Sequence, residues 1–247
     1  MRAGGTVYGT MAFEFFTPGL MAVLTAAGAD FVILDLEHSG VGVETVKQQI
    51  AAARGLSIVP IVRVSGCHYH LIAPVLDAGA MGIMVPMVET AAQAEQIAGS
   101  CRYRPEGVRG LGFSVGHDDY TGGDVIEKMR EANERTLVIA LIETATGIAN
   151  ADAIMAVPGI DVGWLGHYDL TNTMGITAEF EHPEFLAGAR RLAEAAVRHG
   201  KAAGFLATSV AMAREWRSRG FRCLGFGTDV GLLATALSAG IGALRGG

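Results

Sequence analysis

The sequence predicts a (β/α)₈ (TIM) barrel, for three reasons. The chain has 247 residues, the usual length of one such barrel and long for most other single domains. Short apolar runs alternate with longer stretches of helical periodicity, as in a parallel sheet whose strands are joined by helices. Polar residues follow several of these runs directly, where barrel strands carry an active site. We therefore expect residues 1–247 to form a single barrel domain.

Eight runs are candidate strands. Most are short and apolar throughout, as expected of strands that are covered on both faces. The 34 glycines suit the many tight turns that such a barrel needs. In chain order, the predicted strands are Thr6–Thr10, Phe31–Leu34, Ile58–Arg63, Gly82–Val85, Leu137–Ile142, Val162–Leu165, Ala202–Phe205 and Cys223–Gly227.

Helical periodicity fills the segments between the strands. Thr17, Thr90 and Ser209 are candidate N-caps, and Pro18 would take the first helical position after Thr17. The predicted helices are Pro18–Ala27, Val43–Arg54, Ala91–Cys101, Pro183–Arg198 and Val210–Arg219. The glycines expected to end helices in the left-handed conformation are Gly28, Gly55, Gly200 and Gly220.

One long segment, Arg102–Thr121, has no helical or strand periodicity and is rich in Gly, Arg and His. Loops of this length inside a compact domain are usually functional. We interpret it as a long active-site loop, with His117 as the residue that could close over the site.

Composition excludes several classes of partner. The formal net charge of −6 argues against nucleic acid and against an anionic membrane surface, since both require a basic face. Apolar stretches are interrupted well before the length of a membrane span, and the start of the chain lacks the apolar run of a signal peptide. Three cysteines cannot all pair, and none forms a CxxC motif. We expect a reduced, cytoplasmic protein.

Two carboxylates follow neighbouring predicted strands. Glu143 comes directly after Leu137–Ile142, and Asp169 lies four residues beyond Leu165. Both side chains can converge above the barrel, where two oxygen ligands with the other positions left to water and substrate suit Mg²⁺, Mn²⁺ or Co²⁺. A carboxylate at a strand end can also cap the next helix or pair with arginine. Their adjacency favours a metal site.

Acid–base and anion-binding residues occur at the same rim. The histidine imidazole is suited to proton transfer near neutral pH, so His38 could act as general acid or base, oriented by Asp35 or Glu37. Arg63 ends the third strand and offers a fixed fork for a carboxylate or a developing enolate. Arg63 could instead form a buried ion pair with Asp35 or Glu143. The two roles are compatible, because the carboxylates of an empty site need a balancing positive charge.

Two further turns bear on the ligand. The turn Gly166–Asp169 offers backbone N–H groups that can bind a small carboxylate. Gly225–Thr228 lies where many barrels bind phosphate, but Asp229 would place its own carboxylate at the start of the last helix, which disfavours a phosphorylated substrate. No lysine ends a strand, which weighs against a Schiff-base mechanism.

Taken together, these motifs resemble the HpcH/HpaI aldolase/citrate lyase family, and within it the metal-dependent class II pyruvate aldolases that include 2,4-dihydroxyhept-2-ene-1,7-dioate aldolase. The similarity follows the same order along nearly the whole chain. The segments that carry it are Asp35–His38, Val62–Val64, Leu76–Ala80, Val85–Val88, Arg102–Gly110, Ile142–Thr144 and Gly166–Leu170.

The resemblance implies roles for the residues already singled out. Glu143 and Asp169 would ligate the metal, which pyruvate would chelate through its carboxylate and keto oxygens. Arg63 would stabilise the enolate, and His38, coupled to Asp35, would manage proton transfer. The expected reaction is reversible cleavage of a 4-hydroxy-2-oxo acid to pyruvate and an aldehyde.

The resemblance also implies a homo-oligomer, a trimer or hexamer with the last helices exchanged, in which Asp77 projects into a neighbouring site. Backbone groups of Gly166, His167 and Tyr168 would hold the pyruvate carboxylate, and Phe113–Tyr120 would contact the aldehyde.

Two departures from the family pattern bear on the aldehyde preference more than on the donor chemistry. Leu141 stands where many relatives have Gln, and His167-Tyr168 replaces a common Pro-x pair before the metal-binding Asp. Three alternatives stay open: an oxaloacetate decarboxylase, a citrate-lyase-like or malyl-CoA-lyase-like enzyme, and a non-catalytic metabolite-binding barrel. The first shares the same enolate, the second would need a basic groove for CoA, and the third would not need a base beside a metal.

Overall fold

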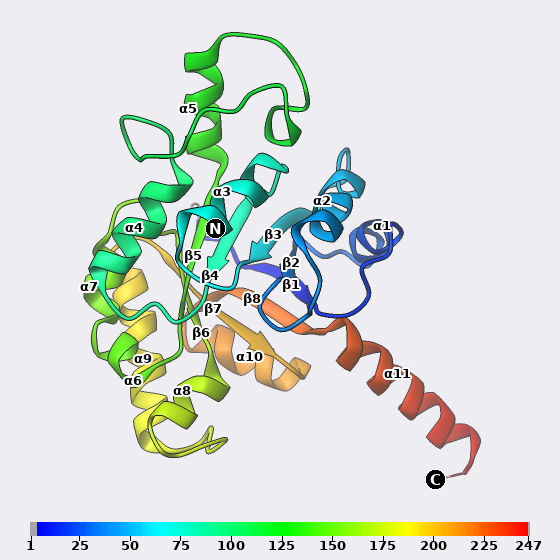
Figure 1. Cartoon of the computed structure of the whole chain (residues 1–247). Helices are drawn as coiled ribbons and strands as arrows, with labels where there is room; N and C mark the ends of the chain where they lie inside the picture. The colour runs from blue at the N-terminus through cyan, green and yellow to red at the C-terminus, as the bar shows by residue number, and fades with distance from the viewer. Residues whose placement is uncertain (1–3, 247) are drawn as a thin grey trace.

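The computed structural model describes residues 4–246, which form a closed barrel of eight parallel strands with helices around it (Figure 1). Each strand pairs with the next along the chain, and β8 pairs with β1 to close the barrel. The predicted fold class is confirmed. The strands are β1 (Val7–Ala12), β2 (Phe31–Asp35), β3 (Val59–Arg63), β4 (Gly82–Val85), β5 (Leu137–Ile142), β6 (Val162–Leu165), β7 (Ala202–Ala207) and β8 (Phe221–Thr228).

Helices return the chain from the carboxyl end of one strand to the start of the next. No helix within residues 4–246 has the length and apolar character needed to cross a membrane. The helices are α1 (Leu20–Ala26), α2 (Val43–Ala52), α3 (Tyr69–Asp77), α4 (Ala91–Cys101), α5 (Val125–Arg135), α6 (Ala145–Ala149), α7 (Ala151–Ala156), α8 (His167–Thr173), α9 (Pro183–Arg198), α10 (Val210–Ser218) and α11 (Asp229–Leu244), with a 3₁₀ turn, η1, at Gly116–Asp118.

Most predicted helix ends are confirmed. The side chains of Thr90 and Ser209 cap α4 and α10, and the four glycines predicted to end helices have φ between 66° and 95°. The prediction at Thr17 is wrong. Helix α1 begins at Leu20, whose N–H donates to the Thr17 carbonyl at 3.0 Å, so the Pro-Gly pair between them forms a turn and not the first helical turn.

Alternation along the strands separates two apolar layers. An inner cluster fills the barrel and includes Ile33, Ile61 and Ile139, while a larger cluster lies between the strands and the helices. The same alternation places the residues at the end of each strand. Asp35 and Arg63 lie opposite each other in the pairing of β2 with β3, just beyond the inner cluster.

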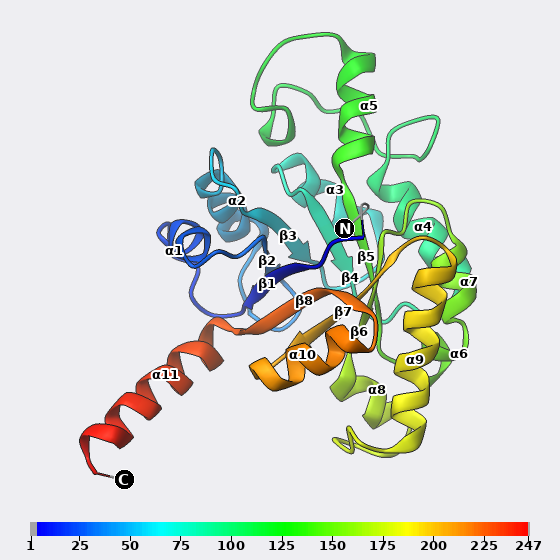
Figure 2. The same cartoon turned by 180° about the vertical axis from the view of Figure 1, so that it is seen from behind.

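The predicted active-site loop, Arg102–Thr121, lies at the other end of the barrel. Helix α4 has already returned the chain to that end, where β5 begins, so the segment and α5 project away from the strand carboxyl ends (Figures 1 and 2). His117 is buried, and its Nε2 lies 2.6 Å from the Gly112 carbonyl oxygen. The interpretation of this segment as a loop over its own chain's site is therefore wrong.

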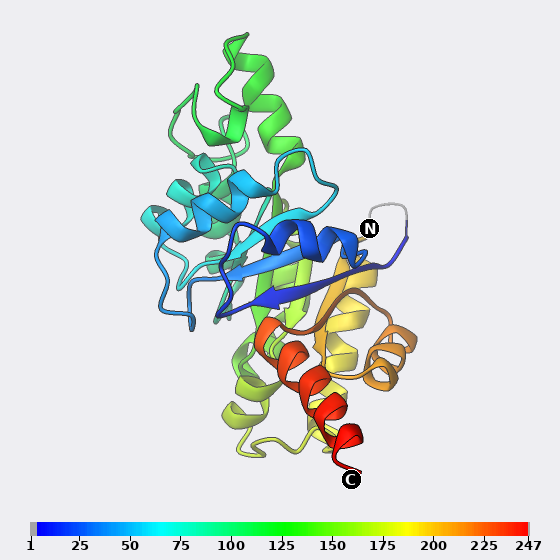
Figure 3. The same cartoon turned by 90° about the vertical axis from the view of Figure 1, so that its right-hand side faces the viewer.

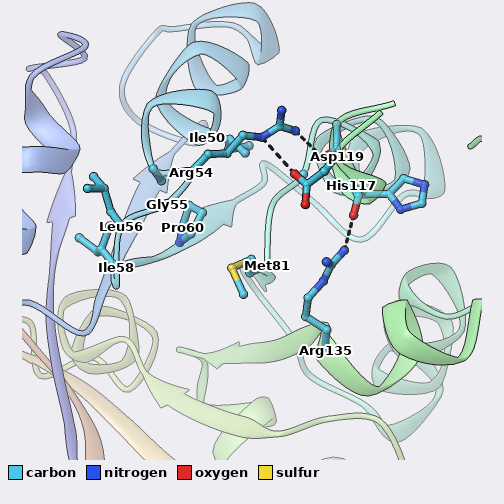
Figure 4. Close-up of a pocket in the computed structure, with 13 residues that line it drawn as sticks. Ile50, Arg54, Gly55, Leu56, Ile58, Pro60, Met81, His117, Asp119 and Arg135 are labelled. Atoms are coloured by element: carbon cyan, nitrogen blue, oxygen red, sulfur yellow. Dashed lines mark hydrogen bonds and ion pairs between the residues drawn. The ribbon is translucent and has the colours of Figure 1, made fainter. Parts of the chain in front are cut away.

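Two arginines fasten this segment to the barrel (Figure 4). Arg54 donates from Nη2 to the Gly116 carbonyl at 2.6 Å, and Arg135 donates from Nη2 to the His117 carbonyl at 2.5 Å. They flank a cavity of about 250 Å³ whose wall includes Pro60 and Met81. Arg54 also pairs with Asp119, whose Oδ1 lies 3.4 Å from Arg54 Nε.

Helix α11 leaves the barrel after β8 and extends outward to the end of the chain (Figures 2 and 3). None of its residues is buried. Its sequence is nevertheless strongly apolar, with Val230, Leu233, Leu237 and Ile241 all exposed. In an isolated chain such a helix leaves a large apolar surface in water.

Candidate active site

A cavity of about 260 Å³ opens at the carboxyl ends of the strands. It collects most of the residues predicted for the site from segments far apart in the sequence. Its lining residues are Met11, Phe13, His38, Arg63, Met84, Leu141, Glu143, Trp164, Leu165, Gly166, His167, Tyr168, Asp169 and Leu206.

Glu143 directly follows β5 and is only 5% exposed. Its Oε1 accepts a hydrogen bond from the Met87 N–H at 2.9 Å. The pKa of Glu143 is raised to about 7, chiefly by burial and also by the nearby carboxylates of Glu37 and Asp169, although the Met87 hydrogen bond and Arg63 act to lower it. A buried carboxylate beside two like charges favours a cation.

Asp169 lies in the first turn of α8, at the exposed mouth of the same cavity. Within residues 4–246 no set of three or more His, Cys, Asp or Glu side chains could hold a metal ion by itself. The residues fit a hard divalent cation that takes two carboxylate ligands and completes its coordination with water and substrate. Glu143 and Asp169 are the side chains that would hold it.

Arg63 is 7% exposed and directs its nitrogens to different partners. Its Nε donates to Asp35 Oδ1 at 2.5 Å, and its Nη1 lies 3.2 Å from Glu37 Oε2. The guanidinium also lies 5.3 Å from the ring centroid of Phe13. Its Nη2 is buried and has no hydrogen-bond partner among residues 4–246. An unpaired buried donor is costly, so Nη2 is the group prepared for a ligand oxygen.

Asp35 is fully buried and shapes the loop after β2. Besides Arg63, its carboxylate accepts the N–H groups of Glu37 at 3.1 Å and His38 at 2.8 Å. The expected contact between Asp35 and the His38 imidazole is absent, because the carboxylate is occupied by the backbone of the loop and by Arg63. Instead, His38 Nε2 lies 3.7 Å from Glu37 Oε2, and the His38 side chain is 58% exposed.

Glu37 is one of the two carboxylates expected to orient His38, and it is the one that lies beside the His38 ring. Its carboxylate lies between Arg63 and His38, and burial raises its pKa despite the nearby arginine. The sequence held a signal for it, since Glu37 stands between Asp35 and His38 after the same strand.

Gly166 allows the turn after β6 to approach Glu143. A Cβ at this position would lie 2.5 Å from Glu143 Oε2 and 2.6 Å from Glu143 Cβ. The turn continues into α8, whose first N–H groups have no partner inside the helix and face the rim. Gly166, His167 and Tyr168 all line the cavity, as predicted.

The His167 ring packs among aromatic side chains. Its centroid lies 4.6 Å from Tyr168, 5.1 Å from Phe180 and 4.9 Å from Phe205. Burial lowers the pKa of His167 to about 4, so the imidazole is neutral near pH 7.

Asp77 is not brought to the cavity of its own chain. It ends α3, at the start of β4, and accepts a hydrogen bond from Arg109 Nη2 at 2.6 Å. The structure thus places Asp77 at the far end of the barrel, away from the cavity of its own chain.

Asp229 occupies the start of α11 with its own carboxylate, as predicted. It accepts the N–H groups of Phe13, Glu14 and Phe15 at 3.0, 2.9 and 2.7 Å. These bonds hold the loop after β1, including Phe13 beside Arg63. In this chain the Asp229 carboxylate lies at the end of β8, near the position where many barrels bind phosphate.

The barrel is closed, and its carboxyl rim carries two carboxylates and an arginine with one unpaired nitrogen. This arrangement is typical of a (β/α)₈ enzyme that binds small anions. The family model of HpcH/HpaI aldolase/citrate lyase matches residues 13–236. The chain belongs to the HpcH/HpaI aldolase/citrate lyase family, and it is a carbon–carbon lyase of the aldolase type.

Individual relatives cover nearly the whole chain. It is 35% identical to a hydroxypyruvate/pyruvate aldolase of Chromohalobacter salexigens over 98% of this chain and 95% of the relative. It is 36% identical to a 5-keto-4-deoxy-D-glucarate aldolase of Klebsiella pneumoniae, over 87% of this chain and 83% of the relative. A solved HpcH/HpaI aldolase from Desulfitobacterium hafniense superposes with a TM-score of 0.93 at 29% identity, covering 98% and 94% of the two chains.

Proposed function

We propose that this protein is a divalent-metal-dependent aldolase that reversibly cleaves a 4-hydroxy-2-oxo acid to a pyruvate-type 2-oxo acid and an aldehyde. The observation that carries the proposal is the unpaired, buried Nη2 of Arg63 in the same cavity as Glu143 and Asp169. A cation and an anion-binding donor at one point suit the charge that develops on a keto oxygen when a carbon–carbon bond breaks. Relatives named for pyruvate and hydroxypyruvate support this donor class.

Glu143 and Asp169 would hold the ion, for which we propose Mg²⁺, Mn²⁺ or Co²⁺. When bound, it supplies Lewis-acid stabilisation of the negative charge on the keto oxygen. Arg63 would donate from Nη2 to the same oxygen, while its bonds to Asp35 and Glu37 keep the guanidinium in place. The backbone N–H groups of Gly166 to Tyr168 would hold the substrate carboxylate.

Proton transfer would fall to His38, with Glu37 beside it. In the cleavage direction, His38 takes the proton of the C4 hydroxyl and the C3–C4 bond breaks. The electron pair of that bond forms the C2=C3 double bond, while the π pair of the carbonyl moves onto the keto oxygen. The aldehyde then leaves, and C3 takes up a proton to give the 2-oxo acid. The exposed His38 lies at the cavity mouth, on the side from which an aldehyde enters or leaves.

We further propose a homotrimer or homohexamer. The apolar residues of α11 are exposed and would be buried by a neighbouring subunit. Tyr8, Val210 and Phe226 line a hollow beside β8 that α11 of the same chain leaves open.

In such an oligomer, Asp77 would contribute to the active site of a neighbouring subunit. Two inactive variants, Asp77→Ala and Glu143→Gln, should then regain part of the activity when mixed oligomers form, about a quarter of the sites being intact in a random dimeric pairing. Failure of such complementation would remove Asp77 from the neighbour's site.

We also propose that the protein is cytoplasmic, and the state of its cysteines bears on this proposal. Cys67, Cys101 and Cys223 are all unpaired. Burial raises the pKa of Cys101 and Cys223 to about 12, so both thiols stay protonated and unreactive. This supports a cytoplasmic protein.

The decisive experiment measures exchange of the pyruvate methyl protons in D₂O by NMR, which reports enolate formation without any aldehyde. After chelation the exchange should stop, and Mg²⁺, Mn²⁺ or Co²⁺ should restore it. Glu143→Gln should abolish the exchange, whereas Glu95→Gln, an exposed carboxylate on α4, should not. Full exchange in exhaustively chelated protein would overturn the proposed function.

A further inference from the structure

The walls of the active-site cavity divide into a polar and an apolar part. Arg63, Glu143 and Asp169 mark the polar part, where the carboxylate and keto oxygen of a 2-oxo acid would bind. The remaining inward-facing side chains come from five strands and are almost entirely hydrocarbon. They are Met11, Met84, Leu141, Trp164 and Leu206.

Leu141 lies at the boundary between the two parts. It lies on β5, two residues before Glu143, which directly follows the strand, and the side chains of both residues line the cavity. Leu141 pairs in register with Trp164 of β6. Leu141 is 3% exposed, and its Cδ1 would lie 3.2 Å from a Cβ built on Gly166. The hydrocarbon surface thus begins directly beside the carboxylate that we assign to the metal.

His167 also lines the cavity, with an imidazole that is packed among aromatic rings. Its ring contacts Phe205, which belongs to the outer apolar cluster between strands and helices, whereas Leu206 is the β7 residue that faces inward. Among the described side chains of the apolar part, the Trp164 indole N–H is the one hydrogen-bonding group. Its benzo ring is fixed over Gly204 and Gly225.

We propose that Leu141 makes the subsite for C3 of the donor apolar, so that the enzyme prefers 2-oxo acids with an alkyl group at C3 over those with a hydroxyl group. The inference rests on the proposed function and deepens it. With the carboxylate and keto oxygen directed to the polar part, C3 must face the other wall. An added methyl gains roughly fourfold in affinity by burial, while a hydroxyl that loses its water without a new partner loses about tenfold.

The test compares pyruvate, 2-oxobutyrate and hydroxypyruvate as donors for the metal-loaded protein. Two quantities are measured for each acid: the dissociation constant by calorimetry, and the rate of C3 proton exchange in D₂O against a protein-free blank. For the wild type, 2-oxobutyrate should bind at least tenfold more tightly than hydroxypyruvate and should exchange with the higher kcat/KM.

Two substitutions separate polarity from shape. Leu141→Gln keeps a side chain of similar size and adds an amide, so the ratio of hydroxypyruvate to 2-oxobutyrate affinity should rise at least tenfold. Leu141→Met keeps an apolar side chain and should preserve the wild-type order of donors. Thermal unfolding of both variants verifies that they are folded.

The outcomes distinguish the two levels of inference. Preference of the wild type for hydroxypyruvate, or an unchanged ratio in folded Leu141→Gln, overturns the role of Leu141 while leaving the aldolase intact. Absence of exchange for all three acids with metal present overturns the proposed function, and the donor preference with it.

Discussion

Arg63 and Asp35 form a buried ion pair in which one nitrogen of the arginine is engaged and another is left unpaired. Nε donates to Asp35 Oδ1 at 2.5 Å, whereas Nη2 has no partner within the part of the chain that the structure describes. Because Asp35 also accepts two backbone N–H groups, it is a fixed anchor for the guanidinium. The structural pair and the anion-binding donor therefore belong to the same side chain and use different nitrogens.

Replacement of Arg63 by lysine separates these two contributions. An ammonium can stay near Asp35, but it cannot reach Asp35, Glu37 and the ligand with one fixed fork. We expect kcat to fall by roughly 100-fold for Arg63→Lys. We expect Arg63→Ala, in addition, to destabilise the fold by about 3 kcal/mol, since it leaves the Asp35 carboxylate buried without a cation.

Steady-state kinetics and urea unfolding measure the two effects. A Lys variant within fivefold of the wild-type kcat would show that the free nitrogen is not used in the reaction. An Ala variant as stable as the wild type would show that the backbone N–H groups alone neutralise Asp35.

Gly166 offers a test of the metal site that leaves every proposed ligand in place. A Cβ on this residue would meet Glu143 Oε2 at 2.5 Å, so Gly166→Ala must displace the carboxylate. Metal affinity should weaken at least tenfold, as expected when support around a ligand is disturbed. Gly99 has open space around it on α4, so Gly99→Ala serves as the matched control.

Calorimetric titration with Mn²⁺ measures both variants. Equal affinities for Gly166→Ala and Gly99→Ala would mean that Glu143 is not a ligand in the position observed.

The sequence sufficed for the parts of the site that depend on strand ends. Glu143, Arg63 and His38 each lie at the end of a strand or within three residues of it, and a parallel barrel brings all such ends to one rim. It did not suffice for contacts that depend on side-chain direction. Whether the Asp35 carboxylate meets the His38 ring or its N–H is decided by the turn after β2, which apolar periodicity does not encode.

The misplacement of Arg102–Thr121 has a different cause. Its composition resembles that of a functional loop, but a segment between a helix and the following strand must lie at the opposite rim. Topology therefore outweighs composition at this point. Helices α3 and α5 are absent from the predicted helices. Pro74 interrupts the helical periodicity of α3, and polar residues dominate the sequence of α5.

Acid stability should depend on Asp118 in that segment. Its carboxylate accepts the N–H groups of Ser114 and Val115 at 2.8 and 2.9 Å and pairs with Lys128 Nζ at 2.7 Å. Although burial acts in the opposite sense, the bonds from Lys128 and the two N–H groups lower the pKa of Asp118 to about 2. Since the folded value lies below the unfolded one, this stabilisation is complete above about pH 4 and is lost as the pH falls toward 2.

Urea unfolding between pH 2 and 6 checks this dependence. Asp118→Asn should lose about 1–2 kcal/mol at pH 6, after allowance for solvent screening, and should converge on the wild type near pH 2. Parallel pH profiles for the two proteins would refute the contribution of Asp118.

Helix α11 provides the test of assembly. Val230, Leu233, Leu237 and Ile241 recur at intervals of three and four residues, so they form one exposed apolar stripe along the helix. A stripe of this kind is stable in water when it packs against another surface. The wild type should therefore elute as a trimer or hexamer, and the double substitution Leu233→Glu with Leu237→Glu should dissociate it.

Thr235 lies on the opposite side of α11, and the control Thr235→Glu should leave the oligomer intact. Light scattering coupled to size exclusion gives the mass of each species. A monomeric wild type would contradict the proposed assembly. It would also contradict the proposed contribution of Asp77 to the active site of a neighbouring subunit.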